Sequence, residues 1–374
     1  MTSPTLSSVL DNLPHAAGTD LAPDVPAVAP ATAEDVAAVM AAATREGARV
    51  MVLGTGTHQG YGYPVAPDVV VATTGLTKVV DYEPDDLTLT VQAGVTIDEV
   101  AAVLATEGQT AVLPEDAGTA TTGGVVAAGL SGWRRRRYGP TRDRVIEVEL
   151  VTGDGRVVHA GGRVVKNVTG YDISRLATGS FGSLGIITMV TFKLWPGSSH
   201  TATIRVDAPA AAAPAFRPLA VLEEQAGVRV LLGGTDREVA GYVDAIDGKA
   251  SEGLDWPDPP SGAYQFVMRL PAATLAAGVA LIRELLPDAA FVAAHGVGDV
   301  RIGADHVEPD VAAELRSFAE KHLGSLVVAD VPDEFRAGFD PWGALPDAMD
   351  LQRRVKAAFD PLGVCNPGRL PGRL

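Results

Sequence analysis

The first half of the chain mixes helical and strand-like spacing of hydrophobic positions. Residues 32–46 (TAEDVAAVMAAATRE) predict a helix, because Thr32 can cap its start and Gly47 can end it. The apolar run at 49–53 (RVMVL) predicts a strand that leads directly into the glycine-rich segment GTGTHQGYGYP. Glycine lacks a Cβ, so the backbone N–H groups of such a loop can approach a ligand closely.

The pattern continues with alternating strands and a second capped helix. Residues 87–94 (LTLTVQAG) alternate as a half-buried strand does, and Thr96 with Glu99 has the spacing of a capping box. The stretches at 145–151 and 157–159 predict a hairpin, since an Asp-Gly pair between them favours a tight turn. We therefore expect mixed α and β structure, with a domain boundary at the Pro-Gly pair near residue 197.

The part beyond residue 197 has fewer glycines and predicts a smaller α+β domain, which we expect to be ferredoxin-like. The strands are expected near 201–206, 228–233, 263–269, 290–295, 299–303 and 325–330, and the helices near 236–246, 272–286 and 309–322. The tail from residue 351 predicts a helix followed by an irregular segment. No internal repeat is evident in the sequence.

Composition narrows the class of protein. The chain has 374 residues, of which 47% are hydrophobic, so it can bury a sizeable core. A net charge of -16 repels nucleic-acid backbones, which makes a nucleic-acid-binding role improbable. Cys365 is the single cysteine and cannot form an internal disulfide or an iron–sulfur site, so we read it as a small residue of the tail.

The sequence also bears on where the protein works. Its N-terminus lacks a basic segment followed by an apolar one, and no window of about eighteen uninterrupted apolar residues occurs. We therefore expect a cytoplasmic protein that reaches a membrane only through partner subunits.

The glycine-rich loop by itself is weak support for a nucleotide site, because GTGTH matches neither the dinucleotide fingerprint nor the P-loop. A second segment, AGTATTGGVVAAGLSG at 117–132, consists almost wholly of small residues and needs something bulky packed against it. The order of these segments along the chain is more specific than either one alone.

Taken in that order, the segments resemble the FAD-binding domain of the vanillyl-alcohol oxidase and p-cresol methylhydroxylase (PCMH) superfamily, which includes D-lactate dehydrogenases and glycolate oxidase. The likeness covers residues 30–197 well and 351–370 moderately. The residues that it assigns to the cofactor are Gly54, Thr55, Gly56, Thr57 and His58 in VLGTGTHQ, Thr121, Gly123, Gly124 and Ala127 in ATTGGVVA, Tyr138, Arg142 and Asp143 in YGPTRD, Gly185, Ile186 and Ile187 in GSLGII, and Asn366 in NPGR.

The resemblance implies a fold and a function. The fold is an α+β, two-subdomain PCMH-type FAD-binding domain at 30–197 with an α+β cap at 198–330, preceded by a segment at 1–29 and followed by a returning segment at 331–374. The chain looks most like the FAD-binding subunits of bacterial glycolate oxidases. These work with a sister flavoprotein subunit and an iron–sulfur subunit to oxidise a small 2-hydroxyacid such as glycolate or D-lactate. The alternatives are a free-standing FAD-dependent alcohol or hydroxyacid dehydrogenase or oxidase, and a scaffold that has lost FAD.

One departure from the family pattern concerns metal. Metal-dependent members carry an H-x-G-D-G-N-x-H segment in the cap, and AAHGVGDVRIG keeps its His295, Gly296 and Asp299. Ile302 stands where the second histidine should be, and no Glu-His pair follows later in the cap. We therefore expect no metal site, and this puts autonomous hydroxyacid chemistry in doubt.

Two cap residues are candidates for catalysis. His295 could accept the hydroxyl proton of a hydroxyacid, and Arg269 could bind its carboxylate. A structural hydrogen bond for His295 and a strand-edge position for Arg269 are the competing interpretations, which we favour because no motif supports a catalytic role for either.

Three further features of the FAD-binding part stay open. His58 could be a covalent flavin attachment site, but aligning the glycines puts Thr57 at the usual histidine position, so we expect FAD to be held noncovalently. The run Arg134 to Arg137 could contact cofactor, a partner or solvent. Lys166 could be structural or face the flavin.

Overall fold

The computed structural model describes residues 4–16, 22–163 and 170–374. The first half of the chain contains helices α1 (Leu6–Leu10), α2 (Ala33–Glu46), α3 (Ile97–Ala105), α4 (Thr122–Ala128), α5 (Arg135–Tyr138) and α6 (Ile173–Ala177). Its strands are β1 (Ala27–Val28), β2 (Val50–Leu53), β3 (Val69–Ala72), β4 (Val79–Glu83), β5 (Thr88–Gln92), β6 (Gln109–Thr110), β7 (Val145–Thr152), β8 (Val157–Gly161), β9 (Gly185–Lys193) and β10 (Trp195–Pro196).

These strands form two main sheets that share one hydrophobic core. A small parallel sheet has the order β1-β3-β2, and a five-stranded antiparallel sheet has the order β4-β5-β9-β7-β8. Helix α2 lies between them and contributes Val36, Val39 and Met40, all fully buried, to a core shared with both sheets. Burying this apolar face stabilises the domain and fixes the strand ends of both sheets relative to each other.

Local sequence signals set several of these boundaries. The side chain of Thr32 accepts a hydrogen bond from Asp35 N, and Gly47 ends α2 in the left-handed conformation. Thr96 and Glu99 form the expected capping box at the start of α3. The β7–β8 hairpin turns at the Asp-Gly pair. These predictions are confirmed.

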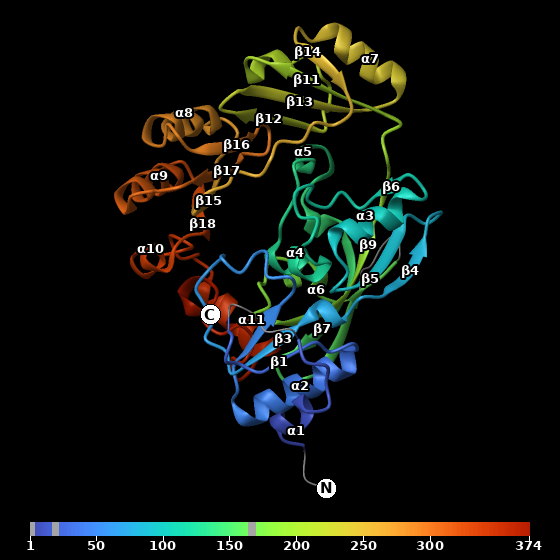
Figure 1. The fold of residues 1–374 in the computed structure, drawn as a ribbon, viewed down its shortest axis with the longest axis vertical. Helices are drawn as coiled ribbons and strands as arrows, with labels where there is room; N and C mark the ends of the chain where they lie inside the picture. The colour runs from blue at the N-terminus through green and yellow to red at the C-terminus, as the bar shows by residue number, and fades with distance from the viewer. Residues whose placement is uncertain (1–3, 17–21, 164–169) are drawn as a thin grey trace.

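The cap contains strands β11 (His200–Val206), β12 (Ala220–Glu224), β13 (Gly227–Gly234), β14 (Lys249–Glu252), β15 (Tyr264–Arg269), β16 (Ala290–Ala294), β17 (Asp299–Ala304) and β18 (Ser325–Asp330). Its helices are α7 (Asp236–Ala245), α8 (Leu275–Leu285) and α9 (Pro309–Lys321). They lie together on the outer side of the cap, away from the first half of the chain (Figure 1). Strands β12 and β14 were not expected from the sequence, because two short strands next to turns give a weak alternation signal.

The cap is a structural duplication. Its eight strands have the order β14-β11-β13-β12-β16-β17-β15-β18. The strands β11 to β14 and the strands β15 to β18 each follow the fourth-first-third-second order of a ferredoxin-like βαββαβ unit, and the two units join through the antiparallel pair β12–β16. In the first unit a short 3₁₀ helix (Pro209–Ala212) replaces the first helix. The expected ferredoxin-like architecture is present twice, although the sequence shows no repeat.

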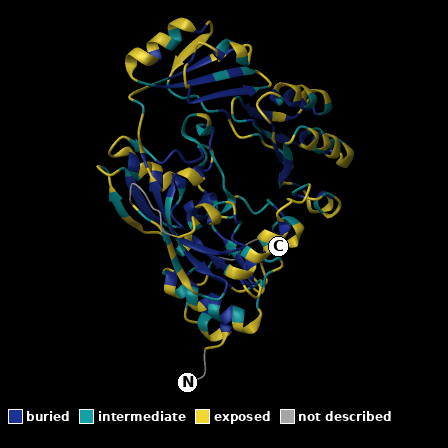
Figure 2. Ribbon diagram, turned by 180° about the vertical axis from the view of Figure 1, so that it is seen from behind, coloured by how far each residue is buried: buried dark blue, intermediate teal, exposed yellow. Residues whose placement is uncertain are grey.

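The C-terminal segment returns from the cap to the first half of the molecule. Helices α10 (Asp333–Gly338) and α11 (Met349–Phe359) lead into a tail in which Cys365 pairs with Val50 of β2. The buried Lys356 Nζ donates to Asp360, to Ser183 O and to Cys365 O. Lys356 is 9% and Asp360 1% exposed, so the pair is covered by protein, although the outer face of α11 is exposed (yellow in Figure 2). Among the described residues, no helix combines the length and apolar character needed to cross a bilayer.

Candidate cofactor and substrate site

The loop after β2 forms one wall of a narrow cavity of about 70 Å³. The rest of its lining comes from segments that are far apart in the sequence, and most of the lining residues are small. They are Val52, Gly54, Thr55, Gly56, Thr57, His58, Gln59, Thr73, Thr121, Gly123, Gly124, Ala127, Ala128, Phe181, Gly182, Gly185, Ile187, Asn366 and Arg369. A cavity walled by backbone and small side chains suits an extended polar ligand.

Close packing explains why small residues are needed here. A Cβ on Gly54 would lie 2.3 Å from Thr121 Oγ1, and one on Gly123 would lie 2.6 Å from the Cβ of Ala93. Thr121 also caps α4, since its Oγ1 accepts a hydrogen bond from Gly124 N. The hydroxyl of Thr55 donates to Thr119 O at 2.9 Å. The loop and the start of α4 are therefore held against each other.

Asn366 in the tail fastens the other side of the cavity. Its Oδ1 accepts from Val52 N at 2.9 Å, and its Nδ2 donates to Phe181 O at 2.7 Å. The residue is 3% exposed and has a φ of 38°, a left-handed conformation that asparagine tolerates better than most residues. One side chain thus joins β2, the segment before β9 and the tail.

Arg369 places a buried positive charge beside the same loop. It is 3% exposed and donates to His58 O, Gln59 O and Gln59 Oε1, but to no carboxylate among the described residues. Burial, with a smaller contribution from Arg336, lowers its pKa to about 10, so it stays charged at neutral pH. A buried cation without an acidic partner is costly unless an anion approaches it.

His58 lies where the narrow cavity meets a larger one. Its Nδ1 is 2.8 Å from Thr57 Oγ1, and its ring is 6.3 Å from that of Tyr61. Burial lowers the pKa of His58 to about 4, so the imidazole is neutral at neutral pH. The Tyr61 ring is 5.9 Å from Phe181, and burial raises the pKa of its hydroxyl.

The larger cavity, about 750 Å³, lies between this loop and the inner face of the cap sheet. The charged side chains that line it are Asp116, Arg135, Arg269, Asp299, Arg301, Asp330, Asp333 and Arg336. Its volume lies within the range of small-molecule sites, and His58 and Tyr61 belong to its wall.

Strand alternation decides which cap residues face this cavity. Phe266 and Met268 of β15 and Ile302 of β17 are buried in the core under α8 and α9. Arg269, which follows Met268, and Asp299, which precedes the buried Val300, are on the other face and line the cavity. Arg269 Nε is 3.5 Å from Asp299 Oδ1, and half of the Arg269 side chain is exposed. This guanidinium is therefore accessible from the cavity.

The arginine run before β7 attaches the cap to the first half of the chain. Arg135 Nη1 is 2.8 Å from Asp299 Oδ2, Arg136 donates to His295 O, and Arg137 donates to Gly233 O at 2.8 Å. The three alternatives left open for this run were cofactor, partner and solvent. The contacts show that Arg135, Arg136 and Arg137 bind this chain's own cap, whereas Arg134 binds Glu115 in the first half.

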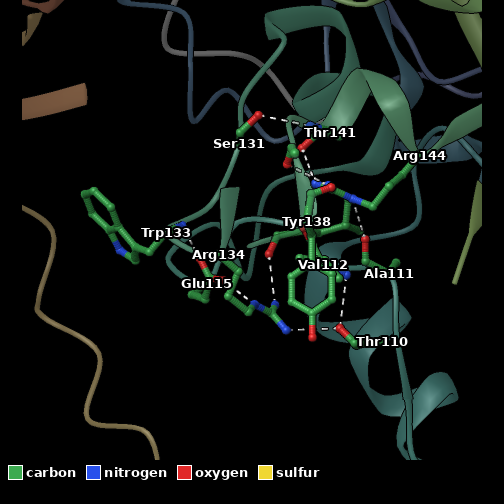
Figure 3. A network of polar contacts seen from close by, with 12 residues as sticks. Thr110, Ala111, Val112, Glu115, Ser131, Trp133, Arg134, Tyr138, Thr141 and Arg144 are labelled. Carbon is green, nitrogen blue, oxygen red and sulfur yellow. Dashed lines mark hydrogen bonds and ion pairs between the residues drawn. The ribbon is translucent and has the colours of Figure 1, made fainter. Parts of the chain in front are cut away.

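A network of polar contacts holds Trp133 and Arg134, at the start of the arginine run, in place (Figure 3). Glu115 accepts from Arg134 Nε at 2.5 Å and from Trp133 N at 2.7 Å. Arg144 is 2% exposed and donates to the carbonyls of Ala111, Val112, Tyr138 and Gly139. The network holds Val112 at a φ of 53°, which is unfavourable for a β-branched residue.

The structure brings most of the residues assigned to FAD into one place. The residues that line the narrow cavity are Gly54, Thr55, Gly56, Thr57, His58, Thr121, Gly123, Gly124, Ala127, Gly185, Ile187 and Asn366. Four others lie outside its lining. Tyr138 packs on Trp195, Arg142 and Asp143 are 3.8 Å apart on the surface, and Ile186 is in the hydrophobic core. Their roles stay predictions, and Lys166 lies outside the described residues.

The two catalytic candidates lie on opposite faces of the cap sheet. Arg269 lines the larger cavity, whereas the Nε2 of His295 is 2.7 Å from Glu223 Oε2 on the side of α8. Glu223 also accepts from Arg283 of α8 at 2.9 Å. These two hydrogen bonds lower the pKa of Glu223.

Sequence reasoning missed several residues of this site. Tyr61 stands in the glycine-rich loop itself, but a tyrosine in such a loop carries no motif. Arg301 could have been found from the alternation of β17, because it lies two positions after Asp299 and therefore on the same face. Asp116, its partner, has no sequence signal, since the two are far apart in the chain.

Comparison with known proteins agrees with this site. Residues 26–161 match the family model described as "FAD binding domain", and this segment is accordingly an FAD-binding domain. The chain is 39% identical over 129 residues to glycolate oxidase subunit GlcE of Escherichia coli, a match that covers 34% of this chain and 37% of that protein. It is 32% identical over 170 residues to the D-lactate dehydrogenase of Archaeoglobus fulgidus, covering 45% of this chain and 38% of that protein.

The matches span well under half of the length of these curated relatives, so they concern the FAD-binding part. A solved structure of alkyldihydroxyacetonephosphate synthase superposes with a TM-score of 0.65 at 16% identity, covering 92% of this chain and 77% of that one. At this identity the likeness shows a common fold that includes the cap.

Proposed function

We propose that this protein is an FAD-dependent oxidoreductase that oxidises a small 2-hydroxyacid, glycolate or D-lactate, as the FAD-binding subunit of a glycolate-oxidase-type complex. The observation that carries the proposal is the connection of two cavities. A narrow, small-walled cavity beside buried Arg369 shares the loop at Gly56 to Gln59 with a larger cavity that Arg269 lines.

The residues present fit FAD, held noncovalently. The glycine and threonine residues at 54–57 would face the pyrophosphate with backbone N–H groups, and Arg369 would supply a positive charge that no carboxylate of the described residues neutralises. Gly124 and Ala127 would leave room for the planar ring. When bound, FAD supplies an acceptor for a hydride from the carbon that carries the substrate hydroxyl.

Arg269 is the residue that we propose for the substrate carboxylate. A guanidinium matches the two oxygens of a carboxylate in a bidentate pair, and Arg269 faces the cavity with half of its side chain exposed. Asp299 also pairs with Arg135, whose Nη1 is 2.8 Å from its Oδ2. The distance from Arg269 to Asp299 is longer, 3.5 Å, so Arg269 is the more weakly bound of the two arginines.

The proton acceptor is proposed among the groups of the cavity. His295 binds Glu223 beneath α8 and does not line either cavity, so we favour His58 for this role. His58 lines both cavities and is neutral at neutral pH; with its pKa lowered to about 4 it would be a weak base that takes up the hydroxyl proton together with the departure of the hydride. The adjacent Tyr61 keeps its proton, because burial raises its pKa, and would donate a hydrogen bond to the substrate.

The similarity to a subunit of glycolate oxidase supports a complex in which a sister flavoprotein and an iron–sulfur subunit accept the electrons. The test is turnover of glycolate and D-lactate with an artificial electron acceptor, for the chain alone and for a co-expressed complex. We expect activity in the complex that falls about a hundred-fold or more on Arg269→Ala, which removes two charge-assisted hydrogen bonds. Activity of the chain alone would indicate a free-standing dehydrogenase, and a complex in which Arg269→Ala changes nothing would refute the substrate site.

A further inference from the structure

A groove at the junction of the two halves carries positive charge that the proposed reaction does not use. Its first lobe, about 350 Å³, is lined by Arg136, Arg137, Phe216, Arg217 and the chain around Pro214. Its second lobe, about 390 Å³, shares Arg137 and Arg217 with the first. Both volumes are within the range of small-molecule sites.

Among the described residues, Arg136, Arg137 and Arg217 form no salt bridge with a carboxylate, although Glu238 of the second lobe lies near enough to Arg137 to interact with its charge. Arg136 donates to His295 O at 3.2 Å, and Arg137 donates to the carbonyls of Arg217 and Gly233. Their neighbours Arg134 and Arg135 pair with carboxylates, whereas these two reach only backbone oxygens. A carbonyl satisfies one N–H but leaves the charge, and a guanidinium has further donors to offer.

The charge is unexpected on a chain with a net charge of -16. Three guanidinium groups around one concave surface create a local positive potential that attracts anions despite the overall charge. Among the described residues, no carboxylate lines the first lobe, and Phe216, 76% exposed, is one of its lining residues. The lobe therefore favours a phosphate group next to an apolar surface.

The second lobe offers an aromatic wall. Trp195 is 37% exposed and packs edge-to-face on Tyr138, with ring centroids 5.3 Å apart. Glu238 is the one acid among the described residues that line this lobe, and it accepts hydrogen bonds from the N and Oγ1 of Thr235, each at 2.8 Å. A planar ring stacked here gains contact area without placing a charge against Glu238.

We propose that this groove binds a nucleoside diphosphate, with its phosphates among Arg136, Arg137 and Arg217 and its base against Trp195. Arg136 and Arg137 belong to α5 of the FAD-binding half, and Arg217 belongs to the cap. The ligand thus bridges the two halves. Because Arg135 of the same helix pairs with Asp299 of the larger cavity, binding stabilises the cap position that shapes this cavity.

The test uses the full chain saturated with FAD, so that the cofactor cavity cannot take up the probe. ADP is titrated into it by calorimetry, with inorganic pyrophosphate and adenosine as partial probes. We expect ADP to bind at a single site, about ten-fold more weakly in Arg136→Ala and Arg217→Ala, each of which removes charge-assisted hydrogen bonds. Arg354→Ala on α11 removes an exposed arginine away from the groove and is expected to leave binding unchanged.

The two lobes are tested separately. Trp195→Leu should weaken the binding of ADP by about ten-fold, because it removes an aromatic stack. It should leave the affinity for pyrophosphate unchanged. Absence of binding, or binding that is equal in all variants, would overturn the proposal, and pyrophosphate binding as tightly as ADP would overturn the role of the second lobe. Flavin content is measured in the same samples, so failure of the groove is distinguishable from failure of the FAD site.

Discussion

The guanidinium of Arg301 on β17 lies 4.0 Å from the centre of the Trp133 ring. Trp133 comes from the FAD-binding half, is 3% exposed, and packs among cap residues that include Leu222 and Val292. Arg301 also pairs with Asp116 and donates to Ser131 O. Two contacts therefore attach the cap. The Trp133 indole packs against the face of the cap sheet, and the Arg301 guanidinium stacks on this indole. The contact sets the far wall of the larger cavity.

Replacing Arg301 tests this attachment. Arg301→Ala removes the cation–π contact and leaves Asp116, 14% exposed, without its partner. We expect a loss of about 2 kcal/mol in the free energy of unfolding, measured by urea denaturation. The control is Arg353→Ala, whose partner Asp350 is 96% exposed, and it should cost less than about 0.5 kcal/mol. Equal losses in the two variants would contradict the attachment.

Alanine substitutions at two glycines of the cofactor cavity are expected to have different effects on folding and on FAD binding. A Cβ on Gly124 meets only Thr121 Oγ1, at 3.0 Å, so Gly124→Ala is expected to fold and to bind less FAD. Gly54→Ala brings its Cβ to 2.3 Å from Thr121 Oγ1 and should destabilise the protein by about 1 to 3 kcal/mol.

The measurement is the ratio of flavin to protein together with the melting temperature. Gly241→Ala on α7 is the matched control, because no atom of the described residues beyond its own helix lies within 4 Å of the added Cβ, and it should keep full flavin content. A Gly124→Ala protein with full flavin would contradict the placement of the cofactor.

The buried His58 predicts a specific pH dependence. Its pKa falls from 6.5 to about 4 on folding, so the folded state prefers the neutral ring. The stabilisation is fully present above pH 6.5 and is lost as the pH falls toward 4. When the pH is lowered from about 7 to about 4.5, the melting temperature of His58→Asn should therefore fall less than that of the wild type. The same variant at the exposed His306 should follow the wild type, and a parallel loss in His58→Asn would show that the ring is not buried.

Cys365 reports whether the tail is docked on β2. It is fully buried next to Asn366, and burial raises the pKa of its thiol far above neutrality. The native protein is expected to resist a thiol reagent such as dithionitrobenzoate at about pH 8, and the unfolded protein to react at its single thiol. Rapid labelling of the native protein would mean that the tail, and with it Asn366 and Arg369, leaves the cofactor cavity.

Features that depend on residues close together in the chain could be predicted from the sequence, whereas contacts between distant residues could not. The caps at Thr32 and Thr96 and the turn after β7 depend on neighbours within a few residues, and the structure has them as predicted. The partners of Arg135 and Arg136 lie in the cap, about 160 positions further on, and nothing local marks them. The sequence could place His295 at a strand end, but only the packing of β16 under α8 determines that it binds Glu223.

The cap duplication was hidden for a related reason. Each ferredoxin-like unit requires only apolar residues at alternate strand positions and turns of suitable length, and many sequences meet this requirement. The first unit has a 3₁₀ helix where the second has α8, so even the pattern of elements differs between them. Topology reveals the repeat, whereas residue identity does not.

The most direct test of the account is an absorbance spectrum of the purified protein, recorded before and after acid precipitation, and then anaerobically with glycolate and with D-lactate. The account predicts flavin bands near about 370 and 450 nm that pass into the acid supernatant and that bleach with substrate when the partner subunits are present. A colourless protein would contradict the central claim that this chain binds FAD, and flavin that stays in the pellet would contradict its noncovalent attachment.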